Sequence, residues 1–302
     1  LFNDSGDSFL MYRVAGPSWI ALGDPTGSRA GAEELVWRFR ELADRHGGQA
    51  VFYQTGAEWL SLYADLGLAP LEVGEDARVR LADFSLEAPA CAGLLQSQRR
   101  AQAAGLAFEV VDPDGIDPLM PALRRISDAW LASKATGEKR FSMGHFSPRY
   151  LRNFPLAIVR AGGAPAAFAT LWTTDTRAEL AVDLMRFGPA APPGTMDFLL
   201  LELLRWSRDQ RYGWLNLGMA PLGGLDRHPL APAWHRVGKF IFRHGEHFHN
   251  FEELRRYKAQ FGPQWQPRYL AARGGIALPR VLIDVSVLVA GGTKSPSRGD
   301  VT

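Results

Sequence analysis

The segment from residue 250 to 271, NFEELRRYKAQFGPQWQPRYLA, interleaves basic side chains with aromatic rings. A protein core takes rings and excludes unpaired charge, so this mixture predicts the wall of a site for an anionic ligand. Lys258 lies among these rings and cations, and its ammonium could stabilise the oxyanion of a tetrahedral acyl-transfer intermediate. Arg255 and Arg256 would strengthen the local field on such an oxyanion. For any single basic residue here, a solvated face is the alternative.

The stretch AVDLMR, residues 181–186, supplies a second candidate pair, Asp183 and Arg186. Side chains alternate along a strand, so residues three apart face one pocket only if the strand bulges or ends there. Asp183 could then receive an ammonium group or deprotonate a hydroxyl. Arg186 could hold a phosphate through its planar fork of donors. A plain ion pair within the domain is the alternative for both.

Charge and cysteine content limit the function classes. The net charge of +2 predicts weak overall attraction to nucleic acid or anionic lipid. Basic residues nevertheless outnumber acidic ones between residues 236 and 273, so this segment is a candidate contact for a polyanion. Cys91 is the one cysteine, which excludes an intrachain disulfide, and we interpret it as a small buried residue. The first residue is Leu rather than Met, so we expect a piece of a longer protein.

Several catalytic motifs are missing from the sequence. It contains no G-x-S-x-G elbow, phosphate-binding P-loop or H-E-x-x-H pair. The histidines of HGEHFH, residues 244–249, lack further ligands nearby, so no metal is expected. In the loop RFGPAAPPGT, residues 186–195, two adjacent prolines remove amide donors that could hold a pyrophosphate. Coenzyme A is therefore disfavoured, and another acyl carrier is expected.

Two α/β units are needed to position these residues. Hydrophobic periodicity predicts this order twice: a hairpin, a helix and a short strand that ends at glycine. The first unit comprises a hairpin over 8–24, helices over 32–48 and 57–67, a strand over 49–56 and a strand pair over 69–81. The second comprises a hairpin over 155–174, strands over 178–189 and 214–221 and a helix over 194–213.

The expected boundaries follow from these units. We expect an N-terminal domain at 1–90, a connector with basic helices at 91–140 and a catalytic domain at 141–290. A flexible tail is expected at 291–302. The apolar stretch 281–292, VLIDVSVLVAGG, carries an aspartate, is too short to span a bilayer and is predicted to be a strand.

The element order resembles that of the GCN5-related N-acetyltransferases (GNAT). Beyond this order, four motifs resemble the cytosolic domain of the multiple peptide resistance factor family. The members of this family are aminoacyl-phosphatidylglycerol synthases, and the motifs are most similar to those of the alanyl enzymes. The motifs are AVDLMR (181–186), PPGTMDFLL (192–200), LNLGMAPL (215–222) and HNFEELRRYKAQFGPQWQPRYLA (249–271). The resemblance implies an α/β chain with tandem acyl-CoA N-acyltransferase (GNAT)-like folds, Fem-transferase-like, with mixed sheets flanked by helices.

The resemblance also implies a reaction, in which an aminoacyl group moves from aminoacyl-tRNA to the glycerol head group of phosphatidylglycerol. Exchange of one ester for another is nearly isoenergetic, so no cofactor is expected. The implied setting is an anionic membrane surface at the cytoplasmic face of the bacterial inner membrane, as the soluble domain of a longer membrane protein. The implied outcome is altered membrane charge and resistance to cationic antimicrobials.

Residue roles follow from the same resemblance. Lys258, Asp183 and Arg186 are the predicted catalytic residues, and Lys258 matches the lysine of the family's aromatic-Lys-x-x-Phe motif. Substrate contacts are predicted at Glu253, Tyr257, Arg268, Tyr269 and Arg255. Either Glu252 or Glu253 could orient Lys258. Phosphates of the tRNA are predicted to meet Arg99, Arg100, Arg124 and Arg125.

Two alternatives remain. A Fem-like transferase would acylate an amine of a peptidoglycan precursor and form an amide. A non-catalytic module would bind tRNA or lipid through the same duplicated fold. Loss of turnover with retained tRNA binding in Lys258→Ala would separate an enzyme from such a module.

Overall fold

The structure is a computed structural model that describes residues 1–86, 91–134, 138–221 and 248–291. Ten strands form one mixed sheet in the order β1-β2-β3-β10-β4-β9-β8-β7-β6-β5. Their bounds are β1 Tyr12–Ala15, β2 Ser18–Leu22, β3 Gln49–Thr55, β4 Ala69–Arg80, β5 Ala107–Val111, β6 Leu156–Ala161, β7 Ala164–Trp172, β8 Glu179–Phe187, β9 Trp214–Pro221 and β10 Gln264–Ala272.

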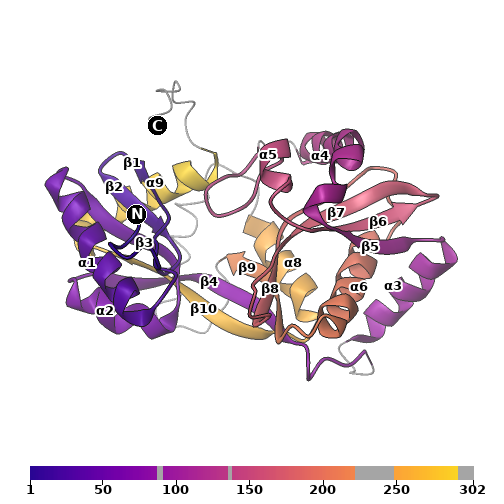
Figure 1. The fold of residues 1–302 in the computed structure, drawn as a ribbon, viewed down its shortest axis with the longest axis horizontal. Helices are drawn as coiled ribbons and strands as arrows, with labels where there is room; N and C mark the ends of the chain where they lie inside the picture. The colour runs from indigo at the N-terminus through magenta and orange to yellow at the C-terminus, as the bar shows by residue number, and fades with distance from the viewer. Residues whose placement is uncertain (87–90, 135–137, 222–247, 292–302) are drawn as a thin grey trace.

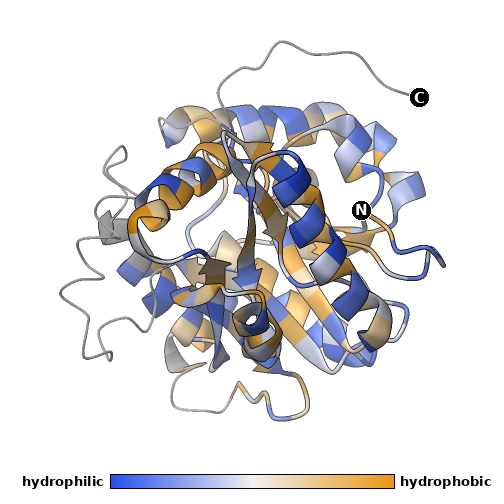
Figure 2. Cartoon of the chain, turned by 90° about the vertical axis from the view of Figure 1, so that its left-hand side faces the viewer, coloured by the Kyte–Doolittle hydropathy of each residue, from blue (hydrophilic) through white to orange (hydrophobic). Residues whose placement is uncertain are grey.

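Helices flank this sheet on both sides (Figure 1). They are α1 Arg29–Arg45, α2 Leu60–Asp65, α3 Ala92–Ala103, α4 Met120–Ser133, α5 Pro148–Leu151, α6 Thr195–Asp209, α8 Phe248–Ala259 and α9 Leu278–Val289. In Figure 2 the helices carry both hydrophilic and hydrophobic stretches, as expected for elements that bury one face. The α/β fold class predicted from the sequence is confirmed.

The predicted repeat of one unit is visible in the strand pairing. Strand β2 pairs antiparallel with β1 and, after helix α1, parallel with β3. Strand β8 likewise pairs antiparallel with β7 and, after helix α6, parallel with β9. A parallel pair needs a long crossover, and α1 and α6 supply the two crossovers.

The two halves exchange a strand at the middle of the sheet. Strand β4 follows the first unit in the chain but pairs with β9 of the second. Strand β10, from the other end of the chain, pairs with β3 of the first unit. The two exchanged strands pair antiparallel with each other from Gln264↔Arg78 to Ala272↔Ala69. The charged residues described below lie on and around this central pair.

Separate cores lie on the two faces of the C-terminal half. Buried leucines of α6 pack with strands β6 to β9 and with α3 on one face. On the other face Leu123, Ile126 and Leu151 from α4 and α5 pack against Phe168 and Leu184. The two faces of this sheet are therefore covered by different helices, α6 with α3 and α4 with α5 (Figure 1).

Two predictions about elements are wrong. The stretch 281–292 is not a strand, because Leu278–Val289 forms helix α9 with Val281, Leu282, Val285 and Leu288 on its buried side. Its aspartate, Asp284, is buried, and hydrogen bonds donated by Ser18 and Arg280 offset the cost of that burial. The segment 69–81 does not form a strand pair, since Ala69–Arg80 is one strand, β4.

Gly74 lies where β4 and β9 approach each other closely. A Cβ at this position would lie 2.6 Å from the Ala220 carbonyl oxygen of the neighbouring strand, so only glycine fits this close approach. Gly74 thus permits the close pairing of β4 with β9.

Candidate functional site

Strands β8 and β9 diverge at the centre of the C-terminal half. Their parallel pairing runs from Glu179↔Trp214 to Ala181↔Asn216, although both strands continue beyond these residues. At the same point the register of β9 against β4 shifts, and Gly218 takes a left-handed conformation with φ +82°. Such a bulge redirects backbone groups away from the ladder and recurs beside active sites.

Lys258 of helix α8 places its amine at this bulge. The Nζ atom donates hydrogen bonds to the carbonyl oxygens of Gly218, at 2.9 Å, and Met219, at 3.0 Å. The residue is only 5% exposed. Burial lowers the pKa of the Lys258 amine to about 8, against the opposing effect of the nearby Asp76 carboxylate. A buried amine with a pKa near neutrality is typical of functional sites.

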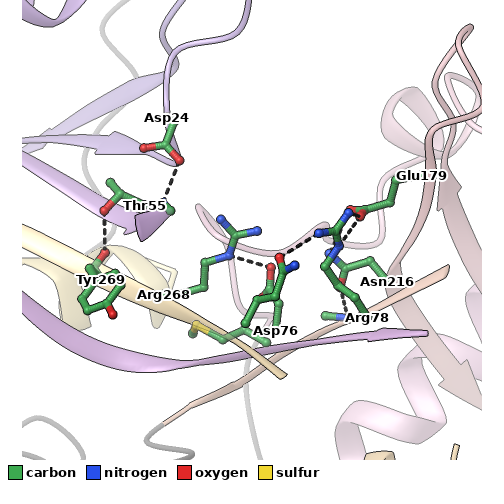
Figure 3. A network of polar contacts seen from close by, with 12 residues as sticks. Asp24, Thr55, Asp76, Arg78, Glu179, Asn216, Arg268 and Tyr269 are labelled. Carbon is green, nitrogen blue, oxygen red and sulfur yellow. Dashed lines mark hydrogen bonds and ion pairs between the residues drawn. The ribbon is translucent and has the colours of Figure 1, made fainter. Parts of the chain in front are cut away.

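A chain of charged residues lies on β4 and β10 (Figure 3), and its Asp76 carboxylate acts on the Lys258 amine. Arg268 donates to the buried Asp76 carboxylate at 2.7 Å. Arg78 pairs with Glu179 of β8 and also donates to Gln266 at 2.7 Å. These contacts join both exchanged strands to the start of β8.

Asn216 links the charged chain to the bulge. Its side chain donates to Glu179 at 3.0 Å, and its amide oxygen accepts from the Gly218 N–H at 2.8 Å. The Asn216 side chain therefore fixes the bulge that binds Lys258 and also connects β9 to Glu179 of β8.

Arg255, one helical turn before Lys258, is engaged within the protein. Its guanidinium donates to Glu75 at 2.9 Å and 3.1 Å and lies 4.5 Å from the Trp265 ring centroid. Arg255 is thus a partly exposed cation held in a fixed orientation beside the Lys258 site.

The charged network extends to the end of β2. Asp24 accepts hydrogen bonds from the Gly56 N–H and the Tyr63 hydroxyl, both at 2.8 Å. Burial raises the pKa of the Asp24 carboxyl, and the cation of Arg268 is among the groups that oppose this rise. Arg268 therefore lies in the electrostatic field of Asp76 on β4 and of Asp24 and Glu58 in the first unit.

Strand β8 contains the bulge that Asp183 and Arg186 need in order to face the same side of the sheet. Its register against β7 shifts between Ala169 and Leu171, which leaves an extra residue in β8. Asp183 consequently meets Gly144 and Tyr150, before and within α5, while Arg186 meets Trp130 of α4. Both side chains thus lie on the face that α4 and α5 cover, which is the condition that the sequence analysis set for a shared pocket.

Asp183 accepts three hydrogen bonds on that face. They come from the Gly144 N–H at 2.8 Å, the Tyr150 hydroxyl at 2.5 Å and the Thr170 hydroxyl at 3.3 Å. A Cβ on Gly144 would lie 2.0 Å from the Asp183 carboxylate, so a side chain at residue 144 would displace it.

Arg186 is almost fully buried. It is 5% exposed, donates to Glu138 at 3.1 Å and lies 4.0 Å over the Trp130 ring centroid. Burial lowers the pKa of Arg186, and Glu138 opposes this effect. Its Nε–H has no partner among the described residues, so one donor of the fork remains for a ligand or a water.

The remaining predicted substrate residues do not gather at one point. Tyr257 packs against Phe261 within the α6 core, and burial raises the pKa of its hydroxyl. Glu253 is exposed and makes no contact with Lys258 in the described part of the chain, and Glu252 is likewise exposed. Neither glutamate orients Lys258, because the two bulge carbonyls do so. Tyr269 lies on β10 at a register shift, with its carbonyl bonded to Thr55.

The four arginines predicted to meet tRNA are exposed but divide between two faces. Arg99 and Arg100 lie on α3, which packs with α6, and Arg124 and Arg125 lie on α4, on the opposite side of the sheet (Figure 1). They do not form one continuous patch.

Several sequence features lie outside the described residues. These are Arg236, Lys239, Arg243, His244 and His247, and of His249 only the helical backbone is described. Among the described residues no group of three His, Cys, Asp or Glu side chains could hold a metal ion. Cys91 is buried as predicted, and its thiol contacts the Gln260 carbonyl.

Sequence reasoning missed the acidic partners of the site. Glu75, Asp76, Glu179 and Asp24 are ordinary carboxylates in strands or loops, without a motif. A charged residue on the buried face of a strand, such as Asp76 in β4, is the signal that could have drawn attention to them.

Comparison with known proteins supplies the family. A family model described as "Phosphatidylglycerol lysyltransferase, C-terminal" matches residues 1–272. Phosphatidylglycerol lysyltransferase of Staphylococcus xylosus is 34% identical over 272 residues, which are 90% of this chain and 32% of that protein. The Bacillus subtilis (strain 168) protein of the same name is 32% identical over 289 residues, 95% of this chain and 34% of that protein. The chain thus spans about a third of the length of these relatives.

Solved structures agree with this family. The C-terminal domain of a protein assigned as lysylphosphatidylglycerol synthetase from Agrobacterium fabrum has a TM-score of 0.87 and 42% identity, covering 97% of this chain and 90% of that one. L-PGS from Bacillus licheniformis has a TM-score of 0.83 and 30% identity, covering 96% and 88%. FemX, at a TM-score of 0.58, 8% identity and coverage of 91% and 86%, shares the fold. No helix in the described ranges is long and apolar enough to cross a bilayer.

Proposed function

Because the chain belongs to the phosphatidylglycerol lysyltransferase C-terminal family, we propose that it transfers an aminoacyl group from aminoacyl-tRNA to a glycerol hydroxyl of phosphatidylglycerol. The observation that carries the proposal is the buried Lys258 amine, bonded to two carbonyls where β8 and β9 diverge. An acyl-transfer site needs hydrogen-bond donors or a positive charge fixed before the reaction begins, and a buried, oriented ammonium supports that role.

The reaction exchanges one ester for another. A glycerol hydroxyl oxygen attacks the acyl carbon, a new C–O bond forms, and the carbonyl oxygen gains negative charge in the tetrahedral intermediate. The bond to the ribose oxygen then breaks, and the ribose oxygen takes up the proton that the glycerol hydroxyl has lost. No bond energy from a nucleotide is required, and the main task of the protein is to align two hydroxyl-bearing substrates and stabilise the oxyanion.

We assign the roles as follows. Lys258 stabilises the oxyanion, and Asp183 acts on the donor or the incoming hydroxyl from the opposite face of the sheet. Arg268 and Arg255 supply positive field beside the site, Tyr257 anchors α8 in the α6 core, and Tyr269 remains a proposed substrate contact. Arg186 supports β8 through Glu138 and has one donor left for a lipid phosphate. Glu253 is exposed on α8 and remains a candidate only for contact with substrate at the edge of the Lys258 site.

The transferred amino acid is a separate question. The relatives named above are lysyltransferases, whereas the motif resemblance in the sequence favoured the alanyl enzymes. None of the comparisons supports alanyl over lysyl. We therefore propose aminoacyl transfer as the reaction class, with lysyl and alanyl donors tested in parallel.

The chain would work as one part of a larger protein. We propose that it lies at the cytoplasmic face of the membrane, where aminoacyl-tRNA and phosphatidylglycerol head groups meet. The division into domains at 1–90 and 141–290, with a connector at 91–140, stays part of this proposal. Arg99 and Arg100 on one face and Arg124 and Arg125 on the other are alternative contacts for tRNA phosphates.

A Fem-like transferase is the second candidate, because FemX shares the fold. Its acceptor would be an amine, and its product an amide. The apparatus around Lys258 would serve either acceptor, since both reactions pass through a tetrahedral oxyanion. Acceptor identity must therefore be tested directly.

The deciding experiment presents the purified chain with phosphatidylglycerol vesicles and with tRNA charged with radiolabelled lysine or alanine. We expect label in the extracted lipid with one donor and none with heat-denatured protein. Lys258→Ala should abolish transfer while retaining tRNA binding, whereas Arg149→Ala, an exposed change in α5, should not. If the chain binds tRNA but neither donor labels the lipid, phosphatidylglycerol is rejected as the acceptor and an amine acceptor is favoured.

A further inference from the structure

Asp183 carries a negative charge that nothing in the described part of the chain neutralises by contact. Its three hydrogen-bond donors, the Gly144 amide, the Tyr150 hydroxyl and the Thr170 hydroxyl, are all neutral. The side chain is partly exposed, so a ligand can reach it. A fixed carboxylate without a cation attracts one from a ligand.

The cation on the same strand is already paired. Arg186 makes its ion pair with Glu138 at 3.1 Å and stacks over Trp130. Lys139 is half-buried, and burial followed by the charge of Arg186 lowers the pKa of its amine. The Asp183 charge acts on Arg186 at longer range, but no ion pair of the described residues joins Arg186 or Lys139 to Asp183.

Aromatic rings extend the Asp183 site. The Tyr150 hydroxyl accepts a hydrogen bond from the Trp172 indole at 3.0 Å. Phe154 lies 4.9 Å from the Tyr150 ring and 6.4 Å from the Trp172 ring, and His145 stacks on Tyr150 at 5.8 Å. The faces of such rings attract cations, and Trp172 is 39% exposed. Carboxylate and rings together therefore match the chemistry of an ammonium group.

This site lies close to the Lys258 amine across the divergence of β8 and β9. A Cβ built on Gly218 would lie 3.6 Å from Lys258 Nζ and 3.8 Å from the carbonyl oxygen of Val182. That carbonyl belongs to the peptide bond that leads into Asp183. In an aminoacyl ester the α-nitrogen is separated from the acyl carbon by one carbon atom, so subsites for oxyanion and ammonium must be neighbours.

We propose that Asp183, Tyr150 and Trp172 form the subsite that receives the α-ammonium of the aminoacyl donor. This inference rests on the proposed function and adds a basis for donor selection. Asp183 forms an ion pair with the ammonium. The Tyr150 hydroxyl holds the Asp183 carboxylate in place, and the Tyr150 and Trp172 rings contact the ammonium from the other side. Every unblocked aminoacyl-tRNA carries this ammonium, so the subsite selects free aminoacyl donors regardless of their side chain.

The test compares two donors that differ only at the α-position. One is the aminoacyl-tRNA that the chain accepts, and the other is a 2-hydroxyacyl-tRNA with the same side chain and the same ester. We expect kcat/KM of the wild-type chain to be roughly 10- to 100-fold lower with the hydroxyl donor, since a hydrogen bond to a charged group is lost. Asp183→Asn should slow the amino donor and bring the ratio of the two donors toward one.

Matched variants keep the result interpretable. Asp128→Asn removes an exposed carboxylate from α4 and should leave the donor ratio unchanged. Tyr150→Phe keeps the ring and removes the hydroxyl, so it should lower the ratio less than Asp183→Asn. This variant also carries the test if Asp183→Asn does not fold.

Two results would overturn the inference while leaving the proposed function intact. One is a wild-type chain that uses both donors equally well. The other is an Asp183→Asn variant that slows both donors by the same factor, which would make Asp183 a base or a structural residue. Failure of the wild type with every donor would instead overturn the proposed function, and this inference with it.

Discussion

Lys258 can serve an acyl transfer in two ways, and the two ways have opposite pH dependences. As a cation it stabilises the oxyanion only while protonated, so the rate falls as pH rises through its pKa of about 8. As a general base it acts only when neutral, so the rate rises through the same pH. At pH 7 about nine tenths of the amine is protonated, and we expect the falling profile.

Initial single-turnover rates between pH 6.5 and 9.5, corrected for spontaneous ester hydrolysis, would distinguish these roles. Lys258→Arg is the informative variant, since guanidinium keeps the charge and does not titrate in this range. We expect it to retain partial activity and to lose the decline near pH 8. A dead Lys258→Arg variant together with a rising wild-type profile would assign Lys258 as the base.

Residue types and spacing indicated the candidate reactive groups but not their partners. Lys258 and Asp183 stood out because a lysine among rings and an aspartate in an apolar strand are unusual locally. Arg255 bonds to Glu75 across 180 residues of sequence, and Arg268 bonds to Asp76 across 192. Pairings this distant depend on strand order, which no local pattern encodes.

At the scale of elements, the bulge at Gly218 controls where the Lys258 amine is held. Replacement by alanine meets no hard contact, since the new Cβ would lie 3.6 Å from Nζ. The cost comes from the backbone, because an L-residue at φ +82° is strained by roughly 1–2 kcal/mol. Relief of that strain would rotate the carbonyls that bind Lys258, so we expect Gly218→Ala to lower kcat at least tenfold.

Gly163 provides the matched control for this change. It also has a positive φ, +81°, but lies in the β6–β7 hairpin with open space around it. Gly163→Ala should lower the melting temperature by a similar amount and leave transfer intact. Equal losses of activity in the two variants would mean that strain alone, and not the position of the bulge, is responsible.

Hairpins and crossover helices were predictable because each is specified within a short window. The β6–β7 hairpin and helix α6 follow from Gly162-Gly163 and from apolar periodicity between residues 195 and 209. Helix α9 was mistaken for a strand because its β-branched residues favour strands, whereas its packing on β1 and β2 decides the outcome. The segment 69–81 was predicted as two strands, because its pairing as one strand depends on β9, far along the chain, as the Gly74↔Pro221 and Glu75↔Ala220 pairs indicate.

At the scale of the whole molecule, the exchange of β4 and β10 makes each half depend on the other. The core beneath the first unit combines Ile20 and Val51 with Leu270 of β10 and Val281 and Val285 of α9. Strand β4, in turn, completes the sheet beside β9, where Lys258 is bound. The arrangement ties the geometry of the candidate site to both ends of the chain.

This dependence predicts the behaviour of fragments. A fragment of residues 1–90 contains β1 to β4 but lacks β10 and α9, so the edge of β3 and the apolar face of β2 are uncovered. We expect it to give no cooperative thermal transition by circular dichroism. Residues 91–291 lack β4 and should also fail alone, because β9 loses its antiparallel partner.

Mixing the two fragments provides the decisive comparison. Since each supplies the strand that the other lacks, we expect the mixture to gain a cooperative transition and a part of the transfer activity of the intact chain. The backbone amides of β3 and β9 should then be protected from hydrogen exchange to a similar degree, as in the intact chain, because the β4–β10 pair joins these strands. A 1–90 fragment that folds by itself would contradict this coupling, since it would show that the first unit does not need the strand it receives from the other end of the chain.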